Sequence, residues 1–148
     1  MSNRLLKFRI WDKKSKCWVS EYENTAGENR LKFFLDTAGK IGKIIYPLNG
    51  DDGSEDNIVN AEDYVVQQFT GLYDEEDVEV YEGDIVSWSD YQGWEDGRTF
   101  TGYYEVKWNE ETLRFDFYEA YENIWWDLAD TQFNVVVGNI FENAKLLE

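Results

Sequence analysis

The sequence contains no histidine, and it has one cysteine and one proline among its 148 residues. Without histidine, neither a Ser-His-Asp or Cys-His nucleophile system nor a histidine-dependent metal site can be built. The single cysteine, Cys17, excludes an intrachain disulfide and a structural zinc site, and it is typical of a reducing compartment. The single proline, Pro47, leaves no proline-rich linker between domains.

Several sequence motifs are absent as well. No Walker-type loop and no GxGxxG motif occurs, so we expect no nucleotide cofactor. No apolar run approaches the roughly 20 residues that a membrane-spanning helix needs. The opening residues MSNRLLKFRI carry charges but lack the apolar segment of a signal peptide. We therefore expect a cytoplasmic protein with no cofactor, no metal and no membrane contact.

Positive charge is scarce after the first third of the chain. Residues 1–50 hold 10 Lys and Arg against 5 Asp and Glu, a net charge of +5. Residues 51–148 hold 4 against 26, a net charge of −22, so the whole chain carries −17. Most of this charge is interpreted as solvated surface that repels like-charged partners. Direct binding to DNA or RNA is not expected, because phosphate contacts need Lys and Arg.

What the chain does contain predicts β-structure. Hydrophobic residues make up 43% and aromatic residues 18% of the sequence, which indicates a folded protein rich in strands. In the N-terminal part, alternation over residues 5–11 places Leu6, Phe8 and Ile10 on one face, and a turn and return strand from Cys17 complete a hairpin. Further strands are predicted at residues 31–36 and 41–46. The Gly- and Asp-rich residues 48–60 are predicted to be a loop between two subdomains, 1–60 and 61–148.

The C-terminal part predicts a small barrel. Strands are expected from Tyr81 through Trp88, over 100–108, over 113–118 and over 133–141, whereas residues 121–130 could be a loop or one helical turn. The last strand is dense in valine and is predicted to be central and buried. Short strands at this spacing suit a closed SH3-like barrel. The predicted fold is therefore mainly β, with an N-terminal hairpin-rich subdomain packed beside a C-terminal SH3-like β-barrel.

Residues 69–86, FTGLYDEEDVEVYEGDIV, read as two strands around the acidic turn 74–77. This stretch resembles the signature of the YopX family, small proteins of bacteriophages and prophages of Gram-positive bacteria. The opening KFRIWDKKSKCW and the closing VVVGNIFENAKLLE are similar to the ends of the family's sequences. Where the family usually has Asn-Gly this chain has Glu76-Asp77, and Ala144 stands where the family usually has proline. The resemblance implies no activity, because the family has no established biochemical function.

Carboxylate chemistry is the one catalytic route that the composition leaves open. A glycosidase-like pair would draw on Glu82, Asp84, Glu105 and Asp116, with Trp88 or Trp108 as a sugar platform. Acidic residues are so frequent here that pairs arise by chance, so we expect no enzyme and no catalytic residue. In place of catalysis, Gly71, Gly83 and Gly138 are assigned to backbone geometry and Asp84 to a turn hydrogen bond.

Residues 51–62 match part of the pattern of a calcium-binding EF-hand loop. Asp51, Glu55 and Glu62 fall at positions 1, 5 and 12 of an EF-hand loop. Gly53 occupies position 3, and Asp56 replaces the glycine required at position 6. We therefore interpret this segment as a solvated acidic loop.

The best candidate for a contact residue is Trp94, in the Gly- and Asp-rich loop 89–97, flanked by Tyr91, Glu95 and Asp96. The sequence is also similar to peptide-binding SH3 domains. We interpret this similarity as one of barrel fold and not of peptide binding, because the tryptophan pair at 125–126 comes too late in the chain. The other tryptophans are expected to fill the core: Trp88, Trp108, Trp125 and Trp126.

The sequence is most consistent with a non-enzymatic phage accessory protein that binds a host or phage protein through its acidic surface. The first alternative is a DNA mimic that inhibits a nucleic-acid-binding host defence protein. A carboxylate-based hydrolase and a structural virion component are the others. The virion component would need self-association, and a homo-oligomer could form through an apolar edge strand.

Overall fold

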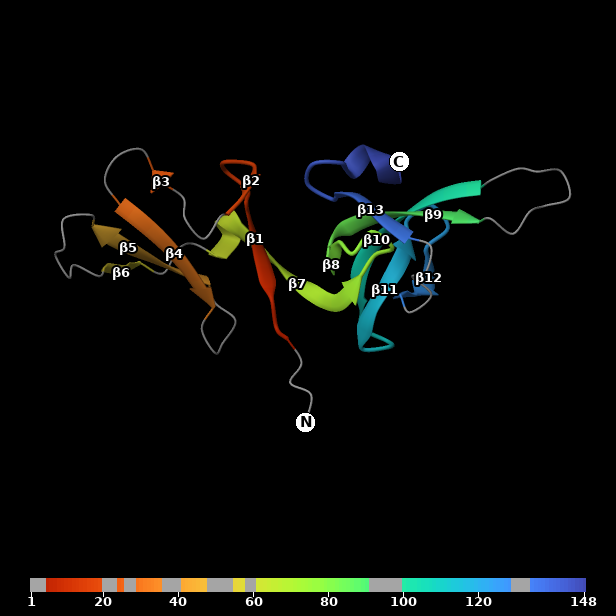
Figure 1. Ribbon diagram of the computed structural model, residues 1–148, viewed down its shortest axis with the longest axis horizontal. Helices are drawn as coiled ribbons and strands as arrows, with labels where there is room; N and C mark the ends of the chain where they lie inside the picture. The colour runs from red at the N-terminus through yellow and green to blue at the C-terminus, as the bar shows by residue number, and fades with distance from the viewer. Residues whose placement is uncertain are drawn as a thin grey trace, which may run out of the picture. The chain divides into compact units, whose positions relative to one another are not determined.

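The structure, a computed structural model, describes residues 5–19, 24–25, 29–35, 41–47, 55–57, 61–90, 100–128 and 134–148 (Figure 1). Antiparallel strands dominate, which confirms the mainly β class. These ranges include two short 3-10 helices, η1 (Ala61–Asp63) and η3 (Ala144–Leu147). No helix within the described residues is long and apolar enough to cross a bilayer.

Contacts divide the chain into two compact units. One unit is Arg9–Val66, and the other combines Met1–Phe8 with Gln67–Glu148. The first unit holds a four-stranded sheet in the order β3 (Asn24–Thr25), β4 (Asn29–Leu35), β5 (Ile41–Pro47) and β6 (Glu55–Asn57). β4 and β5 confirm the predicted strands. β6 lies inside the predicted loop 48–60, where it pairs with residues 43–45 of β5.

The predicted N-terminal hairpin is present as β1 (Phe8–Asp12) and β2 (Cys17–Trp18). Trp11 lies opposite Trp18, with their ring centroids 5.0 Å apart in an edge-to-face arrangement. The carboxylate of Asp12 closes the turn, accepting hydrogen bonds from the amides of Lys14 at 2.8 Å and Ser15 at 3.1 Å. Of the two faces of β1, the one that carries Trp11 is buried, whereas Phe8 on the other face is 41% exposed, because the ring of Trp11 has the Trp18 ring to pack on.

In the other unit, β7 (Tyr64–Tyr73) and β8 (Glu79–Tyr81) pair as antiparallel strands, with Phe69 opposite Tyr81. In the second unit, the amide of Phe69 donates to the carbonyl of Lys7 at 2.8 Å. The Lys7 ammonium donates to Glu79 Oε1 at 2.7 Å, and this contact holds the pKa of the Glu79 carboxyl below its usual range. The family-like stretch 69–86 therefore begins as two paired strands, as predicted.

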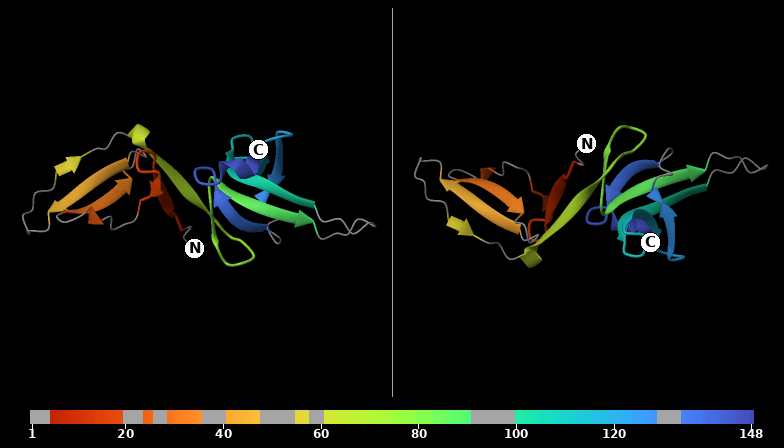
Figure 2. Two further views of the ribbon diagram at one scale, coloured as in Figure 1. Left: turned by 90° about the horizontal axis from the view of Figure 1, so that it is seen from above. Right: turned by 90° about the horizontal axis from the view of Figure 1, so that it is seen from below.

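The largest sheet has five strands and a curled shape (Figure 1). Its order is β12 (Ile124–Asp127), β11 (Arg114–Glu119), β10 (Phe100–Asn109), β9 (Asp84–Asp90) and β13 (Asn134–Asn139). The green-to-blue strands in Figure 2 belong to this sheet, and they remain curled in both views. The hydrophobic core lies on one of its faces and contains Val80, Val86, Val106, Phe115, Phe117 and Leu128.

Two details of this sheet differ from the prediction. β12 is a strand within residues 121–130, where a loop or helical turn was expected. The valine-rich β13 was predicted to be central, but among the described strands it pairs only with β9 and stands at one end of the strand order. Its register shifts between Val136 and Gly138, and Val137 is 39% exposed. A β-bulge turns one valine outward, so an unbroken apolar run did not require burial on both faces.

Candidate interaction surface

The acidic turn of the family-like stretch is organised by Asp74. Its Oδ1 accepts hydrogen bonds from the amides of Glu76 at 2.9 Å and Val78 at 2.8 Å. Its Oδ2 accepts from the amide of Val136 on β13 at 2.9 Å. Asp77 has a φ of +62°, where the family usually has the glycine of Asn-Gly. The buried carboxylate of Asp74 therefore ties this turn to the edge of the five-stranded sheet.

The next turn, between β8 and β9, depends on Gly83. Its φ is +74°, and a Cβ there would overlap the side-chain amide of Gln67. Its amide donates to the carbonyl of Val106 at 2.7 Å, and its carbonyl accepts from the amide of Ile140 at 2.9 Å. Asp84 Oδ2 accepts from the amide of Tyr81 at 2.7 Å, which confirms the predicted turn hydrogen bond. This turn therefore joins three strands without offering a free side chain.

The other predicted glycines differ from each other. Gly71 has a φ of +92° with open space around it, whereas Gly138 has no positive φ, and a Cβ there would overlap the side chain of Asn143. Gly71 needs glycine for its backbone conformation, which confirms that assignment. Gly138 needs glycine for close packing against Asn143, so its assignment to backbone geometry was wrong.

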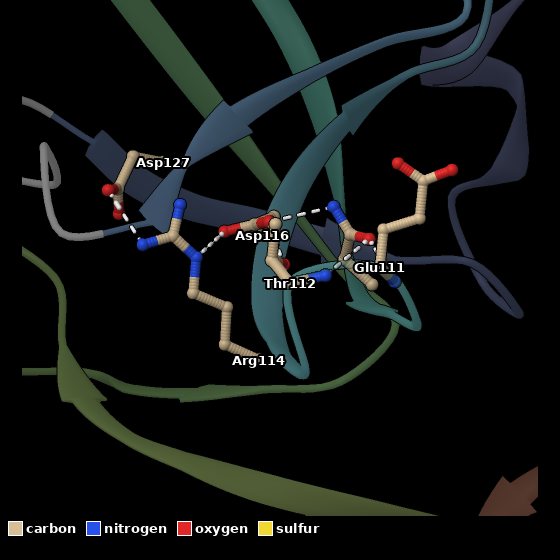
Figure 3. A network of polar contacts seen from close by, with 6 residues as sticks. Glu111, Thr112, Arg114, Asp116 and Asp127 are labelled. Carbon is tan, nitrogen blue, oxygen red and sulfur yellow. Dashed lines mark hydrogen bonds and ion pairs between the residues drawn. The ribbon is translucent and has the colours of Figure 1, made fainter.

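A polar network crosses β10, β11 and β12 (Figure 3). Asp116 Oδ2 accepts hydrogen bonds from Asn109 Nδ2 and Thr112 Oγ1, both at 2.9 Å. Arg114 Nε lies 2.8 Å from Asp116 Oδ1 as an ion pair that is not an aligned hydrogen bond. Arg114 Nη1 also contacts Asp127 Oδ2 at 2.8 Å. Asp116 is 2% exposed, and its Oδ2 atom holds the β10–β11 turn through Asn109 and Thr112.

These contacts describe what the four candidate carboxylates of a hydrolase do. Asp84 and Asp116 are buried and bound by amide, hydroxyl and guanidinium donors. Glu105, on β10, is half-buried, and burial raises the pKa of its carboxyl, with the charge of Glu82 adding to the rise. Of the two proposed sugar platforms, Trp108 packs edge-on against Phe115 at 5.2 Å. Asp84 and Asp116 thus have structural roles, and Glu82 and Glu105 remain as one pair of neighbouring carboxylates.

Exposed aromatic residues occur at the end of the sheet opposite β13, on β12 and in the turn before it. We call Tyr121, Trp125 and Trp126 the β12 aromatic cluster; they are 90%, 38% and 54% exposed. The ring of Trp125 packs 4.8 Å from that of Tyr118, and the Lys107 ammonium lies 4.7 Å from the Tyr118 ring. The prediction that Trp125 and Trp126 fill the core was wrong, and so was the same prediction for Trp108, which is 41% exposed. Adjacent residues of a strand point to opposite faces, so two adjacent tryptophans cannot share one core.

The surroundings of the β12 aromatic cluster are acidic. Residues 119–130 contain no Lys or Arg and four carboxylates, Glu119, Glu122, Asp127 and Asp130. Glu119 also shapes the turn, since its carboxylate accepts from the amides of Tyr121 at 3.1 Å and Glu122 at 2.8 Å. The turn therefore presents an exposed aromatic side chain beside fixed negative charge.

The predicted contact residues Tyr91, Trp94, Glu95 and Asp96 lie outside the described residues. The same holds for Asp51 and Gly53 of the calcium-loop hypothesis, while Glu55 is in β6 and Glu62 in η1. Among the residues that the structure describes, no three His, Cys, Asp or Glu side chains are grouped to hold a metal ion. The described part of the chain thus offers the β12 aromatic cluster as its candidate interaction surface.

The sequence matches the family described as "YopX protein" over residues 7–148. Two solved structures are similar in fold. Protein EF1440 from Enterococcus faecalis is 22% identical with a TM-score of 0.59, covering 99% of this chain and 100% of its own. Protein yopX from Bacillus subtilis is 16% identical with a TM-score of 0.53, covering 95% and 97%. The comparison with curated proteins gives no match.

Proposed function

The chain belongs to the YopX family, and we propose that it is a phage or prophage accessory protein that acts by binding another protein in the host cytoplasm. Binding takes place without catalysis, and the contact surface combines exposed aromatic side chains with surrounding carboxylates. The single observation that carries the proposal is the exposure of Trp125 and Trp126 beside acidic residues.

The composition of this surface supports binding. Residues that dominate the energy of protein interfaces are enriched in Trp, Tyr and Arg, and they need a rim that excludes water. Trp126 leaves 54% of its surface in water, where a large apolar group gains little for its own fold. Residues 91–97, around Trp94, repeat the same combination of one tryptophan with glycine and carboxylates in their sequence. A partner that covers Trp126 would remove apolar surface from water.

The charge supports a basic partner. With −22 over residues 51–148, the protein attracts cationic surfaces and repels nucleic acid. Complementary charge mainly accelerates association, and salt screens it over about 10 Å at 0.1 M. We therefore expect the partner to bind more slowly and more weakly as the salt concentration rises.

The test is affinity capture from a Gram-positive bacterial lysate, with captured proteins quantified by mass spectrometry. Wild type is compared with Trp126→Ala and with a triple variant, Trp94→Ala, Glu95→Ala and Asp96→Ala. The matched control, Glu75→Ala with Glu76→Ala, removes the same two charges from an exposed turn elsewhere. We expect one partner that the control retains and at least one tryptophan variant loses. Equal capture by all four proteins would contradict the proposal.

The captured protein also decides the alternative of nucleic-acid mimicry. A DNA-binding partner that DNA displaces from the complex would favour mimicry over an ordinary protein interface. Mimicry needs rows of unpaired carboxylates at phosphate-like spacing. On the outer face of β11 and β12 the adjacent Asp116 and Asp127 both contact Arg114, so this face gives mimicry no specific support.

A further inference from the structure

We infer that β12 is the binding edge for an extended, Lys- and Arg-rich segment of the partner protein, which adds to the five-stranded sheet as a sixth strand. This inference rests on the proposed function and specifies its partner class. It names one edge of one sheet and the chemistry of the segment that fits there. The mode is strand addition, in which main-chain hydrogen bonds give affinity and side chains give selectivity.

The first observation is the open edge. Within the described residues β12 pairs with β11 only, through Glu119↔Ile124, Tyr118↔Trp125, Phe117↔Trp126 and Asp116↔Asp127. The side of β12 that faces away from β11 therefore carries main-chain donors and acceptors with no strand described beside them. Such an edge is a template for another extended chain. The opposite end of the same sheet is different, since Asp74 already accepts the Val136 amide there.

The second observation is the placement of the two tryptophans. Trp125 shares a face with Tyr118, and Trp126 shares the other face with Phe117. An added strand also alternates its side chains between the two faces. One cationic side chain in the segment would meet Trp125, and a neighbouring one would meet Trp126. Cation–π contacts of this kind already occur on this sheet, where Lys107 lies over Tyr118.

The third observation is the charge, which selects a basic segment over other occupants. Glu119 ends β11 and Glu122 lies in the turn before β12, and residues 119–130 contain no Lys or Arg, while Asp127 on β12 is already paired with Arg114. A second copy of this chain would bring the same carboxylates to the edge and a net charge of −17. Self-pairing would therefore place like charges opposite each other, which is unfavourable.

The probe for the test is a capped synthetic peptide of about eight residues that alternates Arg with Thr and Val, long enough to span a short strand. Its affinity for the full chain is measured by fluorescence anisotropy, and its position by amide and indole chemical shifts in NMR. A peptide with Glu in place of Arg is the charge control. We expect the Arg peptide to bind and to shift the signals of residues 124–127, and the Glu peptide not to bind.

Strand addition is separated from simple charge attraction by two N-methylated peptides. One is methylated at its odd-numbered amides and the other at its even-numbered amides. In an added strand only alternate amides donate to the sheet. We expect one methylated peptide to lose binding at least tenfold and the other to retain it. Equal binding by the two would overturn the inference and leave charge attraction alone.

Three variants locate the site. Trp125→Ala and Trp126→Ala are each expected to weaken the Arg peptide about threefold to tenfold, the range of a single cation–π contact. Trp108→Ala is the matched control, because Trp108 is an equally exposed tryptophan on β10 that does not lie at this edge. Its affinity is expected to equal that of wild type. Circular dichroism confirms that each variant is folded, and the NMR map of wild type needs no variant at all.

The outcomes separate the inference from the proposed function. Capture of a partner from lysate together with no binding of the Arg peptide, or with shifts elsewhere on the protein, would overturn the inference and leave the proposed function standing. Peptide binding in the expected register without a captured partner would support the inference about the β12 edge and contradict the proposed function. A dimer by analytical ultracentrifugation at the concentrations used, with β12 shifts that depend on protein concentration, would name a second copy as the occupant and overturn the inference.

Discussion

The two edge strands of the five-stranded sheet, β13 and β12, differ in how well other residues protect them. At one end, the amide of Val136 on β13 donates to Asp74, a β-bulge interrupts the strand at Val137, and the chain continues into η3. At the other end, β12 is four residues long and presents Trp125 and Trp126 to solvent. Bulges, side-chain acceptors and covering segments are means by which proteins protect a sheet edge.

The difference shows that family signature and interaction surface are separate things in this molecule. The signature stretch supplies Asp74, Gly83 and Asp84, whose contacts connect β7, β8, β9 and the end of β13. None of these three residues lies at β12. Variation at the signature should therefore change stability, and variation at β12 should change binding. The following predictions test this separation, from the largest expected effect to the smallest.

Gly83→Val is expected to destabilise the protein by about 4 kcal/mol or to prevent folding, because it combines a positive φ with a steric overlap. Gly71→Val is the matched control. It shares the positive φ but has open space around it, so we expect a loss of about 1–2 kcal/mol. Chemical denaturation measures both. A denaturation curve for Gly83→Val that equals that of wild type would show that Gly83 does not stabilise the β13 end of the sheet.

Asp74→Ala is expected to cost about 3 kcal/mol, because three amides lose a buried charged acceptor. Glu75→Ala, one position along and exposed, should stay within about 0.5 kcal/mol of wild type. The amide of Val136 should also lose protection from hydrogen exchange in Asp74→Ala. Unchanged protection there would mean that the Asp74 contact does not close this edge.

Asp127→Ala removes an ion pair at the open end and is expected to cost only about 0.5 kcal/mol, since the side chains of both partners remain partly exposed, at 49% and 40%. The measurement is the same denaturation series, repeated at high salt, where the small difference should shrink further. A decrease of more than about 2 kcal/mol in the free energy of unfolding would show that β12 is held as firmly as β13, and the two ends of the sheet would then not differ in this respect.

Glu105→Gln, on the central strand β10, is expected to stabilise the protein by about 0.5 kcal/mol at pH 7. Burial raises the pKa of Glu105 above its ordinary value of 4.5, so the folded state holds this proton more tightly than the unfolded state. Stability from this group is present below pH 4.5 and is lost as the pH rises through the raised pKa. The gain should therefore vanish near pH 4. Peptide binding at β12 should not change, and a change would link the centre of the sheet to its edge.

Much of the fold could be predicted from local patterns in the sequence. Strong alternation in LRFDFY and the Asp-Lys-Lys turn gave β11 and the first hairpin, because each depends on neighbouring residues. The turn glycines could be predicted for the same reason, since a positive φ is a local requirement. Asp116 could not be placed, because its burial depends on Asn109, Thr112 and Arg114 meeting around it.

The edges of the sheet could not be predicted from these patterns. Three successive valines indicate burial, but the bulge that exposes Val137 depends on pairing with β9. β12 was missed because four residues are too few for a periodic signal. The adjacent tryptophans were the available clue, because a strand places them on opposite faces. The predicted contact loop with Trp94 and the boundary near residue 60 stay predictions.

The hydrogen bond between Asp74 and Val136 joins residues 62 positions apart. The turn at 74–78 is local and can form early, but the Oδ2 atom of Asp74 acquires its partner only after the chain through Val136 is available. During synthesis on the ribosome, the β13 end of the growing sheet therefore stays open until Val136 has emerged. Closure of the β13 end would then be a late folding step, and Asp74→Ala should accelerate unfolding while leaving the folding rate nearly unchanged.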